Sequence, residues 1–404
     1  MVEIIETYLR LCKKYRDTSK RTCLFLDEVS AIKEWQKGIK WIIDQDLLEN
    51  CTVLATGSHA ANIINAAERL PGRKGRIKDP HHRLLRPMTF SEFVRIQDKD
   101  IREFMQESPL YEPSSKDKFL QQLYSKEIPE QADQLYNNFS TELGDYFYEY
   151  MLTGGIPKIV DEKNKNGVIA SELYADYLDG LKGDWGLQRN EALLKQFAAT
   201  IINSAGYTIS WDSLRQQAQL GSWSTSQEYA SSLKELAIIS IIHRYNTRKK
   251  IAITAKEKKI YFHDPFYMHM FHSWINPSDP FEVSEEFMAD SINQGRVAEG
   301  VVADHLIRLA FDLTKNKQVF DYSNHVFYWK DHNNKEVDFI FADNKNQVPI
   351  DVKYRNKIDN RELGGLVNFL DETDTKSGIV LSKNESSERR DYVTLPTAVF
   401  LMMV

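Results

Sequence analysis

Two short apolar runs near the start of the sequence, separated by an amphipathic segment, limit the fold more than any other feature. Residues 22–29 read TCLFLDEV, and residues 51–58 read CTVLATGS. Between them, residues 33–48 place their large apolar side chains on one stripe at helical spacing. A strand, a helix and a second strand at this spacing predict a βαβ unit. Such a unit implies a parallel sheet with a ligand crevice at the carboxyl ends of its strands.

The first of these strands ends in two adjacent carboxylates, Asp27 and Glu28. In phosphoryl transfer an aspartate can organise the Mg²⁺ shell, while a glutamate can polarise the attacking water. The second strand ends at Thr56 and Ser58, whose hydroxyls we expect beside those carboxylates. The following segment supplies cations that could meet a triphosphate in cis or in trans: Arg69, Arg73 and Arg76. The alternative is that the acidic pair is only a solvated strand end.

Length and composition limit the class of protein. A chain of 404 residues is too long for one ordinary core and is expected to form about two to four domains. Its 42% hydrophobic and 27% charged residues are typical of a soluble globular protein, and its net charge of −6 argues against a basic coat but not against a local nucleic-acid-binding patch. We expect no membrane span, signal peptide or transit peptide. Three cysteines without a CxxC pair predict reduced thiols and a cytoplasmic location.

Changes of pattern along the chain predict a multidomain α/β protein with four parts. We expect a partial parallel sheet at 1–90, a helical region at 91–190, a third part at 191–275 and a small α/β domain at 290–404, whose last strand is expected at 398–404. A turn rich in Gly and Pro at 153–157 interrupts the helical region. The polar segment 276–286, which contains two prolines, is the best candidate for a linker.

The third part is predicted to hold three short helices and a hairpin, an order typical of a winged helix. We expect a Ser224-x-x-Gln227 capping box to open the third helix. The candidate DNA contacts lie at the start of that helix and at the hairpin tip: Ser224, Thr225, Ser226, Gln227 and Tyr229, then Arg244, Arg248, Lys249 and Lys250. Lys234 is the one cation on the helix, so contact with a protein partner remains the alternative.

The C-terminal part contains a second set of acidic residues. Asp338 lies on one predicted strand, and Asp351 and Lys353 lie on one face of the next, because side chains alternate along a strand. If these strands pair, the two aspartates can share a divalent metal while Lys353 reaches the attacking water or the developing phosphate charge. Glu299 on the preceding helix is another candidate ligand, and Glu336 shares the face of Asp338. The alternative is a surface pair of Asp and Lys, which adds little stability.

Motifs in a fixed order resemble those of AAA-type ATPases of archaea and bacteria that are fused to a C-terminal domain of unknown function. The motifs are LFLDEV, VLATGS, LPGRKGRI, LLRPMTFSEF, TGGIPKIV, KKIYFHDPF, GRVAEGVVADHL, KEVDFIF and PIDVKYR. The resemblance extends over essentially the whole chain and implies ATP and Mg²⁺ as cofactors. It implies these nucleotide-site roles: Walker B for Asp27 and Glu28, sensor one for Thr56 and Ser58, and an arginine-bearing segment for Arg73 and Arg76.

The C-terminal residues also resemble the PD-(D/E)xK nuclease core, which has α-β-β-β-α-β order. Asp351-x-Lys353 stands in place of the commoner Glu-x-Lys, which shortens the ligand by one methylene and keeps its chemistry. The resemblance implies a nuclease-like α/β domain in which Mg²⁺ is held by Glu299, Asp338 and Asp351. It implies catalytic roles for Asp338, Asp351 and Lys353.

One motif of the ATPase family is missing. Walker A is a Gly-rich loop whose N–H groups cradle phosphates before a Lys, and this sequence contains no Gly-Lys dipeptide. We therefore expect a partial P-loop sheet that does not hydrolyse ATP by itself. The expected partners are further copies of the chain in a homo-oligomer, or a separate polypeptide that supplies the loop. Two interpretations follow. One is an ATPase-family protein acting on DNA, and the other is a non-enzymatic scaffold that binds DNA or a protein with both acidic sites idle.

Overall fold

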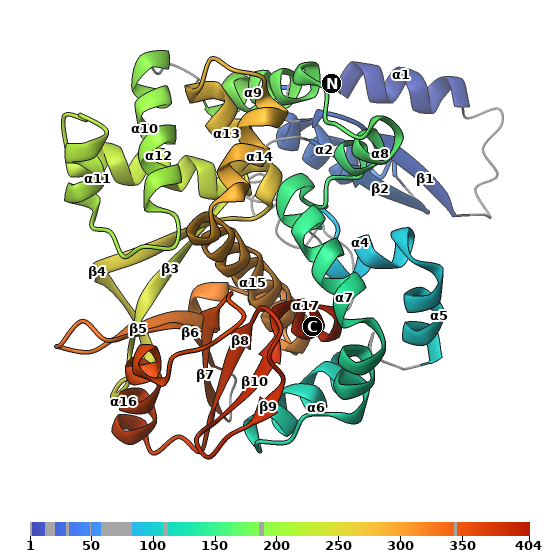
Figure 1. The fold of residues 1–404 in the computed structure, drawn as a ribbon. Helices are drawn as coiled ribbons and strands as arrows, with labels where there is room; N and C mark the ends of the chain where they lie inside the picture. Colours follow the sequence, from blue (N-terminus) through green and yellow to red (C-terminus); the bar gives the residue numbers. More distant parts are fainter. Residues whose placement is uncertain are drawn as a thin grey trace. The chain divides into compact units, whose positions relative to one another are not determined.

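The computed structural model describes residues 2–12, 21–29, 32–48, 50–57, 83–107, 112–185, 190–342 and 346–404. The chain divides into two compact units, one of Met1–Leu85 with Glu235–Ala237 and one of Arg86–Lys234 with Ile238–Val404. The first unit contains the two N-terminal strands, and the second contains the other strands and most of the helices (Figure 1).

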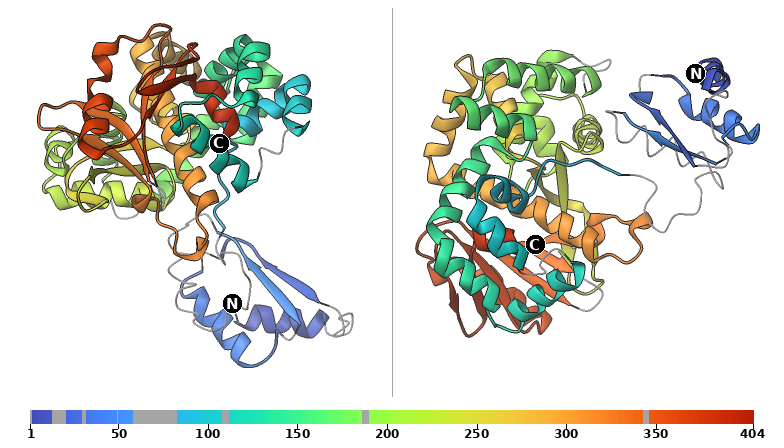
Figure 2. Two further views of the ribbon diagram at one scale, coloured as in Figure 1. Left: turned by 90° about the horizontal axis from the view of Figure 1, so that it is seen from below. Right: turned by 90° about the vertical axis from the view of Figure 1, so that its right-hand side faces the viewer.

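The first unit has the βαβ arrangement that the sequence predicts. Its elements are α1 (Val2–Cys12), β1 (Thr22–Leu26), α2 (Trp35–Asp44) and β2 (Cys51–Ala55). The strands are parallel, with Leu24 opposite Val53. Both helices lie on one face of the strands, where Ile5 of α1 and Ile42 of α2 cluster with Leu24 (Figure 2). On the opposite face Phe25 is exposed, so only one side of this strand pair is covered by the described residues.

The second unit begins with a series of helices. They are α4 (Phe90–Gln97), α5 (Lys99–Glu107), α6 (Pro113–Tyr124), α7 (Glu130–Thr153), α8 (Pro157–Asn166) and α9 (Ser171–Trp185). The predicted break between α7 and α8 is confirmed: Gly154 has a φ of +68°. A Cβ on Gly154 would lie 1.8 Å from a carboxylate oxygen of Asp264, and one on Gly155 would lie 2.2 Å from the carbonyl oxygen of Met88. Close approach of other segments therefore requires both glycines.

Three helices and a hairpin follow in the predicted order. They are α10 (Glu191–Ser204), α11 (Trp211–Gln217), α12 (Trp223–Glu235), β3 (Ile239–Asn246) and β4 (Ile251–Phe262). The predicted capping box is wrong, because Ser224 lies inside the first turn of α12. The hydroxyl of Ser222 accepts the hydrogen bond from the Thr225 N–H, at 3.1 Å, and so begins the helix two residues earlier.

The segment expected as a linker is mostly helical. It lies among α13 (Pro265–Ile275), α14 (Pro280–Ala289) and α15 (Ser291–Leu313). Asp279 accepts hydrogen bonds from the N–H groups of Phe281 and Glu282, and Pro280 is the first helical residue. Asp-Pro is common in loops, but the same two residues also start helices, and here they start α14.

The strands of the second unit form one eight-stranded sheet with the order β4-β3-β5-β6-β7-β8-β10-β9. Its remaining strands are β5 (Val326–Lys330), β6 (Glu336–Ala342), β7 (Gln347–Lys353), β8 (Gly378–Ser382), β9 (Ser387–Glu388) and β10 (Tyr392–Pro396). From α15 to β8 the elements follow the predicted α-β-β-β-α-β order, with α16 (Gly364–Thr373) before β8. Because β3 pairs in parallel with β5 at His243↔Phe327, the hairpin and the C-terminal strands share this sheet.

Helices cover both faces of the sheet. On one face Phe369 of α16 packs in a core cluster with Trp329 and Val337, and α15 crosses the other face (Figure 1). The strand predicted at residues 398–404 is instead a helix, α17 (Thr397–Met403), in which every residue is buried. A continuous apolar run has no periodicity to separate a buried helix from a buried strand, and β10, which the sequence analysis missed, takes the place beside β8.

Candidate functional site

The acidic pair of the first unit lies at the end of β1, beside the end of β2. The Thr56 hydroxyl donates a hydrogen bond to the Asp27 carboxylate, and the Glu28 N–H donates to the same carboxylate at 3.1 Å. Asp27 and Glu28 are exposed, and Glu28 has a φ of +49°. The predicted proximity of Thr56 and Asp27 is thus confirmed. Ser58, Arg69, Arg73 and Arg76 lie outside the described residues.

A second acidic group lies on the face of the large sheet that α15 covers. Glu299 comes from α15, Asp338 from β6, and Asp351 and Lys353 from β7. Strands β6 and β7 are antiparallel, with Phe339 opposite Ile350, and this register brings Asp338 beside Asp351. The side-chain exposures are 14% for Glu299, 12% for Asp338, 0% for Asp351 and 17% for Lys353. The structure therefore brings together the four residues that the sequence placed in one site.

Lys353 links the two aspartates. Its Nζ lies 2.8 Å from Oδ2 of Asp351 and 3.5 Å from Oδ2 of Asp338. The Val352 N–H donates to the same Asp338 oxygen at 3.0 Å. Neither oxygen of Asp351 accepts a well-aligned hydrogen bond from the described residues, although the carboxylate is fully buried. The ammonium of Lys353 and the carboxylate of Asp338 are therefore the charged groups of this cluster that face Asp351.

A second lysine, Lys259 on β4, lies inside the same cluster and was not identified from the sequence. It is only 1% exposed. Its Nζ lies 2.8 Å from Oε1 of Glu299, 2.6 Å from Oε1 of Glu336 and 2.8 Å from Oδ1 of Asp338. The Tyr261 hydroxyl, two residues along β4, donates to the same Glu299 oxygen at 2.5 Å. Its sequence signal was the KKIYFHDPF motif, in which it directly precedes the apolar residues Ile260, Tyr261 and Phe262.

Burial and charge divide the cluster into different protonation states. Burial raises the pKa of Asp351 to about 8, assisted by the charge of Asp338, and burial raises the pKa of Glu299 to about 7. Burial also opposes ionisation of Asp338, but Lys259 and Lys353 hold its pKa below the ordinary range. Burial disfavours the charged form of Lys259, but the carboxylates, Asp338 first, raise its pKa well above the usual value. Both lysines are therefore cations beside an ionised Asp338.

The donor chemistry of this cluster suits Mg²⁺, but its arrangement does not. Carboxylate oxygens are the preferred ligands of Mg²⁺, and both oxygens of Asp351 are buried without a well-aligned hydrogen bond from the described residues. The ammonium of Lys259, however, occupies the space between Glu299, Glu336 and Asp338. Across the described part of the chain, no group of three Asp, Glu, His or Cys side chains is placed to hold one metal ion. The predicted metal ligands converge, but they converge on lysines.

The candidate DNA contacts are only partly accessible. Ser224 and Gln227 are exposed and Thr225 is half-buried, but Ser226 is fully buried. The prediction of a DNA contact by Ser226 is therefore wrong, since successive helical residues face different sides and Ser226 faces the core. Tyr229 is also buried, where its ring packs edge-on against Phe197.

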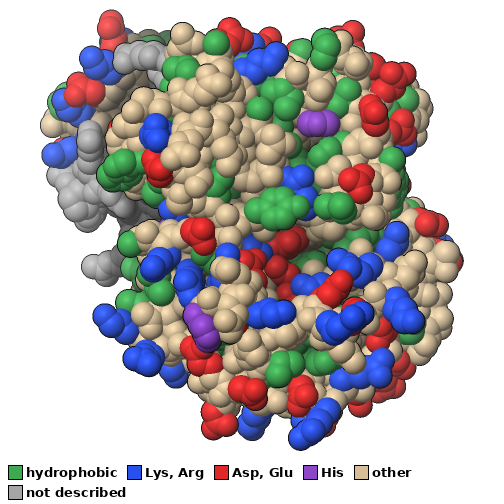
Figure 3. Space-filling view, turned by 60° about the vertical axis from the view of Figure 1, so that its left-hand side comes forward, with side chains coloured by type: hydrophobic (Ala, Val, Ile, Leu, Met, Phe, Trp, Pro, Cys, Tyr) green, Lys and Arg blue, Asp and Glu red, His purple; other side chains and the backbone are tan. Residues whose placement is uncertain are grey.

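The hairpin tip has a different character. Arg248, Lys249 and Lys250 are exposed in the turn between β3 and β4. Beside the tip lies an open hollow of about 580 Å³, whose lining is Thr247, Arg248, Lys250, Gln347, Glu372 and Thr373. Figure 3 shows a face of the molecule on which acidic side chains gather in a recess, with Lys and Arg around it.

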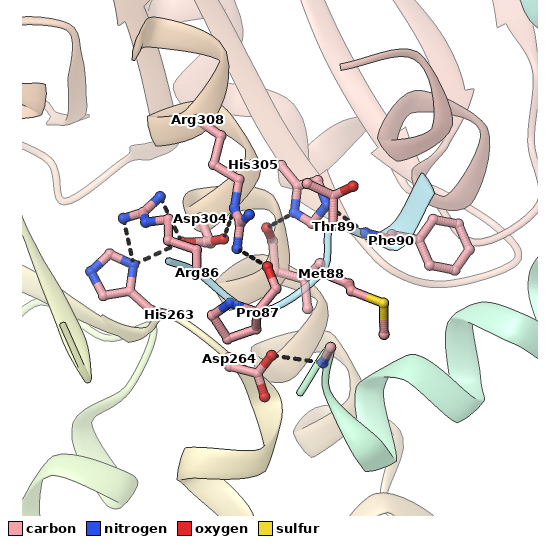
Figure 4. Close-up of polar contacts among 12 residues, drawn as sticks. Arg86, Pro87, Met88, Thr89, Phe90, His263, Asp264, Asp304, His305 and Arg308 are labelled. Atoms are coloured by element: carbon pink, nitrogen blue, oxygen red, sulfur yellow. Dashed lines mark hydrogen bonds and ion pairs between the residues drawn. The ribbon is translucent and has the colours of Figure 1, made fainter. Parts of the chain in front are cut away.

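A buried ionic network fixes the start of the second unit (Figure 4). Asp304 of α15 is 3% exposed and binds three partners. Its carboxylate accepts from Nε of Arg308 at 2.6 Å, lies 2.7 Å from Nδ1 of His263, and pairs with Arg86 at 3.3 Å. Arg308 also donates to the carbonyl oxygen of Pro87 at 2.8 Å. This network was not predicted from the sequence, although Asp304 and Arg308 stand four residues apart, a spacing that places both on one side of the helix.

Further hydrogen bonds hold the same segment. The Phe90 N–H donates to Nε2 of His305 at 3.0 Å, and the Tyr150 hydroxyl donates to the Met88 carbonyl at 2.7 Å. Asp264 accepts from the Gly155 N–H at 2.7 Å, next to Met88. Residues 86–90 are therefore anchored to α7, to α15 and to His263, which directly follows β4, within the second unit.

Family models match three separate stretches of the chain. Residues 2–94 match an AAA domain, residues 144–277 match a domain of unknown function (DUF8612), and residues 294–400 match another domain of unknown function (DUF4143). No curated protein and no solved structure matches the chain. None of the helices formed by the described residues is long and apolar enough to cross a membrane.

The parallel strands that lead into Asp27 and Thr56 lie within the stretch that is similar to an AAA domain, and this similarity suggests an ATPase-like, nucleotide-binding protein. More particularly, the two terminal matches support an AAA-type ATPase-like protein with a C-terminal domain of unknown function.

Proposed function

We propose that this ATPase-like protein acts on DNA, through a winged-helix-like hairpin and a nuclease-like acidic site in its second unit. The observation that supports this function is the convergence of Glu299, Asp338, Asp351 and Lys353 from three elements onto one sheet face. The α-β-β-β-α-β order around them is the order of the PD-(D/E)xK core that the sequence resembles. Fold alone does not establish an activity, so the proposal depends on these side chains.

The residues of this site have separable tasks in the proposed reaction. Lys353 is a partly exposed cation and would contact a scissile phosphate and its developing charge. Asp338 remains ionised and fixes Lys353. At the hairpin tip, Arg248, Lys249 and Lys250 would contact the DNA backbone, which gives binding that weakens with salt and depends little on sequence.

Cleavage of DNA tests the proposal. Supercoiled plasmid is incubated with the full chain in Mg²⁺ or Mn²⁺, alongside Asp351→Ala and Lys353→Ala. We expect wild-type cleavage to fall by about a hundredfold or more in either variant. Lys353→Ala removes the group that contacts the developing charge, and Asp351→Ala removes the buried carboxylate that lies 2.8 Å from Lys353. Lys357→Ala removes an exposed lysine from the segment after β7 and serves as the control that keeps activity. If neither wild type nor the variants cleave DNA with any metal or DNA substrate tested, the proposal of nuclease activity is wrong.

The second candidate is a non-enzymatic module that binds DNA or a protein. The position of Lys259 favours it, because this side chain already neutralises the acidic residues. In that case DNA binding would persist without cleavage and would weaken on replacement of Arg248, Lys249 and Lys250 by Ala. The dependence of log affinity on log salt would become shallower by about one for each phosphate that the protein no longer neutralises. A variant of Lys165, exposed on α8, is the matched control.

A further inference from the structure

Lys259 differs from an ordinary buried lysine in the number of charges that it contacts. An ammonium has three N–H donors and no acceptor. One oxygen of each of three carboxylates, from Glu299, Glu336 and Asp338, lies within 2.8 Å of its nitrogen. The three carboxylates come from α15 and β6, so the lysine joins a helix to the sheet. Two of these contacts are hydrogen bonds, to Glu299 and Asp338, and the third is an ion pair with Glu336.

The neighbouring lysine provides an internal comparison. Lys258 is also 1% exposed, but it lies on the opposite face of β4 because side chains alternate along a strand. Its Nζ stacks over the ring of Trp211, 4.1 Å from the ring centre. Two adjacent lysines are therefore equally buried, and only Lys259 enters the acidic cluster.

The cluster has acceptor capacity beyond what Lys259 uses. Asp351 is fully buried, and its two oxygens accept no well-aligned hydrogen bond from the described residues. The Lys353 ammonium lies 2.8 Å from one of them. A buried carboxylate without a donor is costly unless a cation lies against it. The site is thus built for positive charge, and two lysines supply it.

We propose that Lys259 is the resident cation of this acidic site: its ammonium takes the place that a divalent ion would occupy between Glu299, Glu336 and Asp338. The inference rests on the proposed function only for the identification of the site as nuclease-like. An ammonium and a divalent ion cannot share a space bounded by three carboxylates at these distances, because like charges repel strongly in a buried site. A metal ion therefore binds there only when Lys259 is displaced or removed.

Binding of Mn²⁺ by the full chain tests this assignment, with free and bound ion separated by electron paramagnetic resonance. The set is wild type, Lys259→Met, Lys258→Met and the double variant Lys259→Met with Asp338→Asn. We expect Lys259→Met to bind Mn²⁺ at least about tenfold more tightly than wild type, with an affinity gain that the added Asp338→Asn removes. Lys258→Met should match wild type because its side chain faces away. Equal affinity in wild type and Lys259→Met overturns the proposal.

A measurement on the unaltered site covers the case in which Lys259→Met does not fold. The melting temperature of wild type and Asp338→Asn is followed with and without Mn²⁺. We expect Mn²⁺ to change the melting temperatures of wild type and Asp338→Asn equally, because the resident lysine blocks the site in wild type. If Mn²⁺ raises the melting temperature of wild type and Asp338→Asn abolishes this rise, the metal binds with Lys259 present and the proposal fails.

Cleavage and metal binding are separate readouts, so the two proposals can fail separately. DNA cleavage by the same samples reports only on the proposed function. If no variant cleaves DNA but Lys259→Met binds Mn²⁺ more tightly than wild type, the proposal of nuclease activity is wrong and the proposal of a resident cation is supported. If wild type cleaves DNA and binds Mn²⁺ as tightly as Lys259→Met, the proposal of nuclease activity is supported and the proposal of a resident cation is wrong.

Discussion

The chain contains two sets of acidic residues beside β-strands, and their surroundings differ in exposure and in counter-charge. Asp27 and Glu28 are exposed at the end of a parallel pair of strands, and Asp27 accepts a hydrogen bond from a threonine hydroxyl. Asp338 and Asp351 are nearly or fully buried in the large sheet, in a cluster that contains two lysines. Water can solvate the first pair, whereas the second set requires cations within the protein. An exposed acidic pair is accessible to a ligand, and a buried one is first of all part of the structure.

The largest expected effect is on the folding stability of the second unit when the resident cation is removed. Lys259→Met leaves three partly buried carboxylates facing one another without their shared ammonium. Without divalent metal, we expect the free energy of unfolding to fall by about 3–5 kcal/mol, the usual cost of breaking a buried ion pair. Urea unfolding followed by circular dichroism measures it, with Lys258→Met as the control. A loss below about 1 kcal/mol would mean that the cluster does not need its lysine.

Replacement of the other lysine should have a smaller effect. Lys353 is 17% exposed and contacts two carboxylates, one of them at 3.5 Å. Asp351 can then become protonated, since burial already raises its pKa to about 8. We expect Lys353→Met to cost about 1–3 kcal/mol in the same unfolding experiment. If Lys353→Met lowers the free energy of unfolding as much as Lys259→Met does, the difference in exposure between the two lysines has no effect on stability.

These two lysines also show what the sequence could and could not predict. Asp351 and Lys353 were found because residues two apart on a strand share a face, and Asp338 because adjacent strands pair. Lys259 was missed because it lies 79 positions before Asp338, on a strand that looked like part of a separate hairpin. Alternation shows which residues share a face, but not which distant strand joins the sheet. The pairing of β3 with β5 is what brings β4, and with it Lys259, to the acidic residues.

The same limit explains the errors in the fold. Local patterns correctly predicted the βαβ unit, the break between α7 and α8, and the order from α15 to β8. Asp279-Pro280 looked like a linker because loop and helix-start signals use the same residues. Residues 398–404 looked like a strand because an evenly apolar run has no period. In each case tertiary burial, which a local pattern does not contain, decided the outcome.

Asp264 differs from both acidic sets in its surroundings. It is buried, but among the described residues its carboxylate accepts hydrogen bonds from backbone N–H groups rather than from a cation. Its carboxylate accepts from Gly155 and Phe266, and burial raises its pKa to about 7. The unfolded-state pKa of an aspartate is about 3.9. Because the pKa is higher in the folded state, protonated Asp264 adds to the free energy of unfolding. This contribution is fully present below about pH 4 and is lost as the pH rises to about 7.

We therefore expect wild type to lose more stability than Asp264→Asn between pH 5 and pH 8, by about 1–3 kcal/mol. Glu299 and Asp351 shift in the same direction and remain in both proteins, so the difference isolates Asp264. Urea unfolding at the two pH values gives the comparison. Parallel losses in both proteins would show that Asp264 is ionised throughout and that its two backbone donors suffice.

The smallest expected effect on stability belongs to the exposed pair. Asp27→Asn keeps an oxygen that can accept from Thr56 and removes a charge that water already solvates. We expect the free energy of unfolding to change by about 1 kcal/mol or less. Any binding of Mg-ATP by the full chain should weaken by about tenfold or more, because the charge faces the ligand side of a parallel sheet. Isothermal titration with Mg-ATP measures this, and Asp46→Asn, in the turn after α2, is the exposed control. Strong destabilisation by Asp27→Asn would show that the exposed pair is as structural as the buried one, and the contrast between the two acidic sets would not hold.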